Sequence, residues 1–94
     1  MVYILLLIKI SERIEIEVTE KGEYFGNYLS RIEDIKDKKE IMIGLPLDKG
    51  TIVPLRIGSI VNINITKADG VYTFAYKNFR KDRDRSNRKR GVFR

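Results

Sequence analysis

The sequence contains no cysteine and no histidine among its 94 residues. Disulfide frameworks, zinc sites with Cys or His ligands, Ser-His-Asp triads and Cys-His dyads are therefore all excluded. The lack of cysteine permits a reducing compartment. These absences exclude more functions than any other feature of the composition.

Long apolar segments are also lacking. The longest, residues 2–8 (VYILLLI), is far shorter than the roughly 20 residues of a membrane-spanning helix, and no basic segment precedes it as in a signal peptide. We therefore expect no membrane insertion and a cytoplasmic location. The segment itself is apolar on both strand faces, which suits a strand covered on both sides or a surface for another domain or subunit.

Charge is distributed unevenly. Residues 80–94 (RKDRDRSNRKRGVFR) contain eight basic and two acidic residues and carry the whole net charge of +6, while residues 1–79 are neutral. By composition this segment is typical of a flexible tail, and such charge runs are often only solvated linkers. Six of its basic residues are arginines, which favours bidentate binding of phosphate or guanine. We interpret the chain as a neutral folded body with a cationic tail for an anionic partner.

Alternation with a period of two, and no helical period, predicts an all-β fold. Ile14, Ile16 and Val18 share one parity with Ile8 and Ile10, and Ser11-Glu12 is the expected turn or bulge. Asp69-Gly70 is a strong hairpin signal. Further strands are expected at residues 24–35, with a bulge, and at 41–45, 59–66 and 71–79. We predict one small antiparallel β-barrel of five to six strands.

Two groups of residues are weighed as functional sites. Tyr72, Phe74 and Tyr76 share one face of the last expected strand and suit either ordinary core or a platform on which nucleic-acid bases stack. Carboxylates such as Glu15 and Glu17 fall on the solvent side of a strand, and nothing places them together in a cleft. We expect no enzymatic activity and no metal site.

Three segments in this order carry a resemblance: SRIEDI at residues 30–35, LPLDKG at 45–50 and DGVYTF at 69–74. From about residue 8 to 94, the chain resembles the N-terminal domain of YcgR-type flagellar brake proteins, a small split-barrel-like domain that precedes a PilZ domain. The resemblance implies a barrel domain at residues 1–79. Residues 80–94 would be a basic linker and the start of a PilZ domain.

PilZ domains open with an Arg-x-x-x-Arg motif that binds cyclic di-GMP, and residues 90–94 (RGVFR) have this form. The resemblance implies that Arg90 and Arg94 contact the ligand, with Arg88 and Lys89 as assisting candidates, and that no cofactor is needed. A second PilZ motif, Asp or Asn-x-Ser-x-x-Gly, does not follow. The resemblance thus implies an N-terminal piece that binds the ligand weakly by itself, and partners that include a PilZ domain and flagellar motor proteins.

Two functions follow as hypotheses. The first is a regulator of flagellar motility that responds to cyclic di-GMP. The alternative is a small β-barrel that binds RNA or single-stranded DNA, with the arginine-rich tail on phosphates and Tyr72, Phe74 and Tyr76 under the bases. The alternative predicts binding to generic nucleic acid that weakens steeply with salt.

Overall fold

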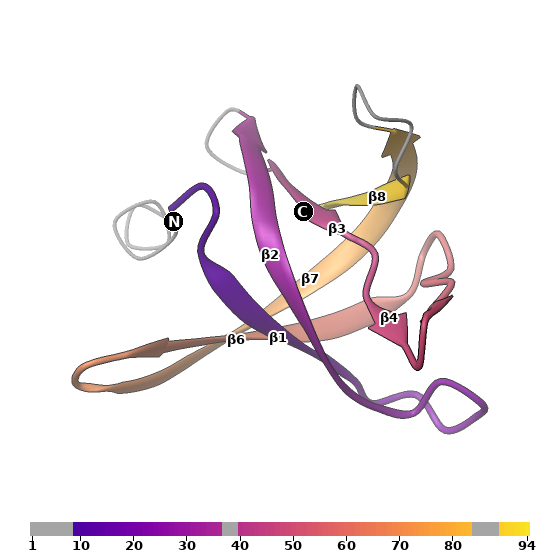
Figure 1. Ribbon diagram of the computed structural model, residues 1–94, viewed down its shortest axis with the longest axis horizontal. Helices are drawn as coiled ribbons and strands as arrows, with labels where there is room; N and C mark the ends of the chain where they lie inside the picture. Colours follow the sequence, from indigo (N-terminus) through magenta and orange to yellow (C-terminus); the bar gives the residue numbers. More distant parts are fainter. Residues whose placement is uncertain (1–8, 37–39, 84–88) are drawn as a thin grey trace.

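The computed structural model describes residues 9–36, 40–83 and 89–94, with the side chains of residues 82 and 83 left out. All regular secondary structure in these ranges is β. The described residues contain no helix that is long and apolar enough to cross a membrane. Six strands form a closed antiparallel barrel in the order β1-β2-β3-β8-β7-β6 (Figure 1). They are β1 (Arg13–Val18), β2 (Gly26–Lys36), β3 (Glu40–Gly44), β6 (Ile60–Lys67), β7 (Gly70–Arg83) and β8 (Lys89–Phe93). The predicted all-β barrel is confirmed.

Strand β1 shows how the sequence alternation becomes a two-sided strand. Ile14 and Ile16 are buried in the core, whereas Glu15 and Glu17 lie on the outer side. There each glutamate accepts a hydrogen bond from an asparagine amide of β6, at 2.9 Å for Glu15 and 3.2 Å for Glu17. These bonds lie on the short β1–β6 seam that closes the barrel.

The β6–β7 hairpin turns at Asp69-Gly70, as predicted. Its register runs from Ile60 opposite Lys77 to Lys67 opposite Gly70. Gly70 has a φ of +145°, a region that glycine adopts at little cost. The hairpin is the longest antiparallel pairing of the described strands.

The core fills the barrel with β-branched side chains from β1, β2, β3 and β6, and with the rings of Tyr76 on β7 and Phe93 on β8. Its buried members include Ile16, Ile32, Ile43, Ile63 and Phe93, each no more than 1% exposed. Burying a side chain of this size stabilises the fold by roughly 1.5–3 kcal/mol relative to leaving it exposed.

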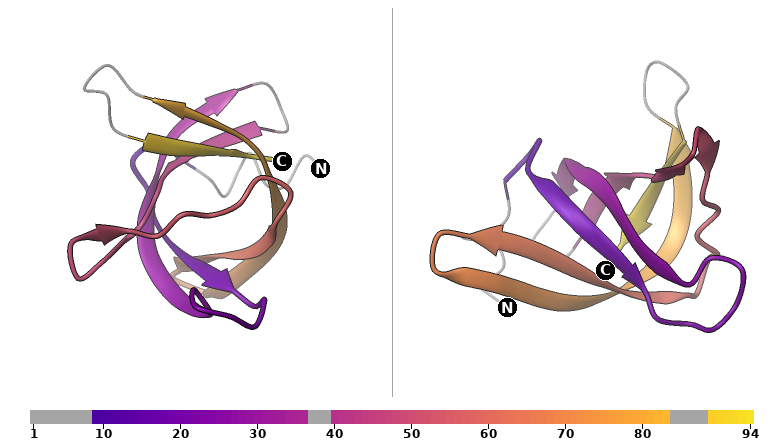
Figure 2. Two further views of the ribbon diagram at one scale, coloured as in Figure 1. Left: turned by 90° about the vertical axis from the view of Figure 1, so that its right-hand side faces the viewer. Right: turned by 60° about the horizontal axis from the view of Figure 1, so that its bottom comes forward.

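The connection from β3 to β6 passes across one end of the barrel (Figure 2, left). It contains a small hairpin of β4 (Leu47–Asp48) and β5 (Thr51–Ile52), and it inserts Val53 and Leu55 into the core. Asn78 of β7 holds this connection: its amide Nδ2 donates to the carbonyls of Leu55 and Arg56 at 2.9 and 3.3 Å. The connection therefore packs onto the body of the barrel.

Two details of the early strands differ from expectation. Ile10 shares the parity of the core residues, yet it is 57% exposed, because the turn at Ser11, with a φ of +72°, breaks the alternation. The irregularity of β2 lies between Ile32 and Asp34, slightly later than the sequence suggested. Residues 2–8 lie outside the described part of the chain.

The larger correction concerns the basic tail. We expected the last strand to end at residue 79 and residues 80–94 to be flexible. Instead, β7 continues to Arg83, and β8 pairs with both β3 and β7, so that β8 closes the barrel. Val92 and Phe93 are fully buried, and this burial is the physical reason that a highly charged segment forms a strand here. The assignment of residues 80–94 to a linker and the start of a PilZ domain remains a prediction.

Candidate anion-binding site

The Arg-x-x-x-Arg motif begins on β8 and ends at Arg94, one residue after the strand, where backbone pairing with Lys77 continues the extended conformation. The strand period of two decides the direction of each side chain. Phe93 points into the core. Its ring lies against Gly91, which has no side chain; a Cβ at that position would lie 2.5 Å from the ring. Arg90, Val92 and Arg94 alternate with these residues and therefore share the outer side of the barrel. The i, i+4 spacing thus places both arginines on one face.

Strand β3 lies beside this row and completes the floor of the site. Gly44 is the partner of Arg90, and Met42 is the partner of Val92. Met42 and Val92 are both 0% exposed, so an apolar pair separates the two arginines. The two arginines therefore lie at opposite ends of an apolar pair that solvent does not reach.

Arg90 forms an ion pair with Glu33 of β2 across the intervening strand. The guanidinium Nη1 lies 3.8 Å from the carboxylate Oε1, and the two side chains are only 18% and 19% exposed. Gly44 makes this contact possible, because a Cβ at that position would lie 2.6 Å from Glu33 Oε2. The carboxylate occupies the space that any other residue on β3 would fill.

Arg94 is held at the other end of the site by Glu40. Its Nη2 and Nε both donate to Glu40 Oε1, at 2.7 and 3.2 Å. Its guanidinium also lies over the ring of Phe79, 4.2 Å from the centroid, a cation–π geometry. Glu40 is only 13% exposed, whereas Arg94 is 60% exposed. The backbone of Arg94 pairs with Lys77, which fixes the end of the chain against β7.

The other two predicted site residues contribute differently. Lys89 is exposed on the first position of β8, and Arg88 lies outside the described residues. Glu33, Gly44, Glu40 and Phe79 were not predicted from the sequence as site residues. Glu33 and Gly44 fall within the segments that carry the resemblance or flank it, but only the pairing of β2, β3 and β8 brings them to Arg90.

The spacing along β8 limits what the two arginines can do together. Four residues of strand span about 13 Å between the Cα atoms of Arg90 and Arg94. In this arrangement each guanidinium is engaged at its own end of the site, by Glu33 and by Glu40. One compact anion can contact both only when the side chains turn toward each other.

A groove of about 740 Å³ adjoins the Arg90 end of the site. Glu33 and Gly44 form one side of it, and Leu29 and Leu47, 80% and 63% exposed, belong to its apolar part. The groove is open to solvent rather than enclosed. Glu33, which lines this groove, is also the residue that contacts Arg90.

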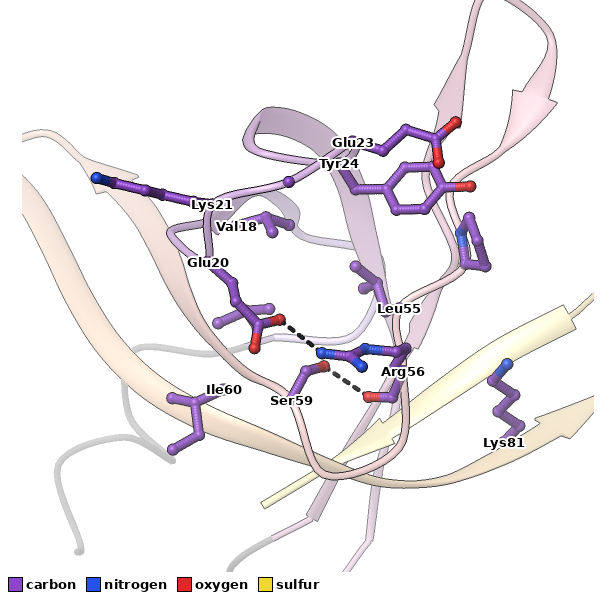
Figure 3. A pocket seen from close by; sticks show the side chains of 13 residues that line it. Val18, Glu20, Lys21, Glu23, Tyr24, Leu55, Arg56, Ser59, Ile60 and Lys81 are labelled. Carbon is purple, nitrogen blue, oxygen red and sulfur yellow. Dashed lines mark hydrogen bonds and ion pairs between the residues drawn. The ribbon is translucent and has the colours of Figure 1, made fainter.

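A second pocket, of about 430 Å³, lies at another place on the barrel (Figure 3). Glu20 and Arg56 form an ion pair across it at 3.1 Å, and Lys21 points away from it. Lys81 of β7 also lines this pocket. Its charged lining consists of Lys21, Arg56 and Lys81 with Glu20 and Glu23, and neither Arg90 nor Arg94 belongs to it.

The aromatic side chains on one face of β7, Tyr72, Phe74 and Tyr76, make contacts within the protein. Tyr76 is 5% exposed within the core, where burial raises the pKa of its hydroxyl, and Phe74 packs against the same cluster. Tyr72 donates its hydroxyl to Asp69 at 2.6 Å, a hydrogen bond that raises the pKa of Tyr72. Of the two interpretations, these contacts favour core packing over a base-stacking platform.

Comparison with known proteins adds a family to this geometry. The family model PilZNR, described as flagellar protein YcgR, matches residues 9–78. This chain belongs to that family. The matched region ends just before Phe79, so it contains Glu33, Glu40 and Gly44, whereas β8 follows it. Comparisons with curated proteins and with solved structures gave no match.

Proposed function

We propose that the protein is a non-enzymatic regulator of flagellar motility that responds to cyclic di-GMP through Arg90 and Arg94. Membership of the flagellar YcgR family supports the flagellar part of this proposal. The observation that supports binding of cyclic di-GMP is that Arg90 and Arg94 share the outer side of the barrel, beside a groove with apolar surface. The ligand's two phosphates and two guanines suit arginine, which binds both groups bidentately and stacks on purines.

The proposed mechanism has the barrel as a rigid platform and the arginines as the responsive part. Ligand binding changes which partners the arginines contact, and the changed surface is presented to a following PilZ domain and to flagellar motor proteins. A ligand shifts such an equilibrium only through contacts that differ between the two states. Arg90 and Arg94 supply that difference.

The alternative, binding of RNA or single-stranded DNA, has less support. Its stacking residues Tyr72, Phe74 and Tyr76 are engaged in the core or in a hydrogen bond to Asp69. The remaining argument for it is the positive charge of residues 80–94. Salt-dependent binding of a random oligonucleotide, with no preference for cyclic di-GMP, would favour this alternative.

Calorimetric titration of cyclic di-GMP into the full-length gene product tests the proposal. A charge-assisted hydrogen bond contributes about 1.5–3 kcal/mol, so Arg90→Ala is expected to weaken binding at least about tenfold. Arg56→Ala removes a cation that is paired with Glu20 at a different pocket, and it serves as the matched control. An affinity that Arg90→Ala leaves unchanged would refute the assignment.

A further inference from the structure

We propose that Glu33 and Glu40 are internal counterions that occupy Arg90 and Arg94 in the absence of ligand, so that an anionic ligand binds by displacing them. This inference rests on the proposed function, since it concerns the same two arginines. It adds two acidic residues that set the affinity of the site. It also adds a defined unliganded state in which both cations are engaged.

The contact between Glu33 and Arg90 restrains the arginine side chain. Its carboxylate lies over Gly44, in the one place on β3 where a side chain is missing, and it reaches Arg90 on the next strand. Both partners are more than four-fifths buried, so water screens their attraction less than at an open surface. Arg90 is thereby directed toward β2 and away from Arg94.

The Glu40 contact engages the second arginine by a different geometry. Glu40 begins β3, and its Oε1 accepts both hydrogen bonds from the Arg94 guanidinium. The Phe79 ring adds a cation–π contact, with the Arg94 guanidinium 4.2 Å from the ring centroid. Because Arg94 is 60% exposed while Glu40 is 13% exposed, a ligand reaches the arginine from solvent without entering the barrel.

The backbone of β8 need not move when these pairs separate. Val92 and Phe93 are both 0% exposed, and their burial anchors the strand between the two arginines. Release therefore involves rotation of two side chains that are joined to a fixed strand. With about 13 Å between their Cα atoms, the two guanidinium groups must leave Glu33 and Glu40 before they converge on one ligand.

The energetic consequence follows from competition. A ligand phosphate that replaces a carboxylate gains the contact with arginine but must first break the existing pair, so the pair lowers the apparent affinity. Removing the charge of either glutamate eliminates this cost. We expect about threefold tighter binding for each neutralised glutamate and about tenfold for both, the range of partly exposed ion pairs.

The test measures ligand affinity in the full-length gene product by calorimetry. The variants are Glu33→Gln, Glu40→Gln and the double variant. The matched control is the double variant Glu15→Gln/Glu17→Gln, which changes the net charge equally but removes carboxylates that bond asparagine amides on β6. Cyclic di-GMP is one probe and inorganic pyrophosphate the other. Thermal unfolding checks that each variant is folded, and Gly44→Ala provides a second way to displace Glu33 if the double variant does not fold.

The outcomes separate this inference from the proposed function. Tighter binding of cyclic di-GMP by the Glu33 and Glu40 variants, with an unchanged control, supports both. Equal affinity in all variants, or weaker binding in the Glu33 and Glu40 variants, overturns the counterion role and leaves the ligand assignment standing. If no variant binds cyclic di-GMP, the proposed function fails. Pyrophosphate then decides the inference: tighter binding by the double variant supports it, and unchanged binding overturns it.

Discussion

Glu33 and Arg90 meet across a strand to which neither belongs. Glu33 lies on β2, Arg90 lies on β8, and the carboxylate passes over Gly44 of β3 to come within 3.8 Å of the guanidinium. A side chain on the middle strand would block this path. A glycine in β3 therefore has a specific role here, which is to let residues two strands apart interact.

Gly44→Ala is expected to break this contact without unfolding the barrel. The new Cβ would lie 2.6 Å from Glu33 Oε2, the end of a flexible side chain, so the carboxylate moves aside. We expect a change in unfolding free energy below about 1 kcal/mol, together with ligand affinity that resembles that of Glu33→Gln. Urea unfolding and calorimetry measure the two effects. An alanine variant that binds like the original protein would show that the Glu33 contact does not limit binding.

Phe93→Ala tests whether the basic C-terminal segment is part of the folded barrel. The side chain is 0% exposed in the core, so its truncation should cost about 3–5 kcal/mol. Phe25 is 64% exposed, and Phe25→Ala is expected to change stability by less than about 0.5 kcal/mol. Urea unfolding measures both. Equal stability of the two variants would mean that β8 does not pack in solution.

Asn78→Ala is expected to loosen the connection that crosses the end of the barrel. Asn78 is 0% exposed, and its amide satisfies the carbonyls of Leu55 and Arg56. Loss of this donor should cost about 1–3 kcal/mol, because a buried acceptor loses its partner. Asn62→Ala, which removes a half-buried amide from Glu17, is the matched control with a smaller cost. Unfolding free energies that do not differ between the two variants would contradict this role.

Tyr76 makes the free energy of unfolding depend on pH in the alkaline range. Burial raises the pKa of its hydroxyl above the ordinary value of 10.0, so the unfolded chain releases this proton first as pH rises. The contribution is complete below pH 10.0 and is lost as pH rises through the pKa of the folded protein. Tyr76→Phe should therefore flatten the decline in unfolding free energy as the pH rises above about 10. Parallel declines for the variant and the original protein would contradict this prediction.

Much of the barrel was predictable because local patterns agreed with the final contacts. Ile14 and Ile16 alternate with glutamates in the sequence and lie inside in the structure, and Asp69-Gly70 forms the expected hairpin. Strand β8 was not predicted, because the charges of residues 80–94 conceal the short apolar pair Val92-Phe93. Two fully buried side chains outweighed a composition typical of disorder.

The acidic half of the site could not be predicted from the sequence. Glu40 lies 54 residues before Arg94, and Glu33 is still farther from its arginine partner, so no local pattern links them. Their proximity depends on the pairing of β3 with β8, which the predicted flexible tail would not form. A short motif identifies the two arginines. Their ion pairs with Glu33 and Glu40 could not be predicted from it.

The central claim is that Arg90 and Arg94 contact cyclic di-GMP together. The direct measurement is an NMR titration that follows the arginine Nε–Hε signals, assigned by their loss in Arg90→Lys and Arg94→Lys. We expect both signals to shift with one common binding curve, because each guanidinium exchanges a carboxylate for the ligand. If both signals stay in place while the ligand saturates the protein, the central claim is wrong.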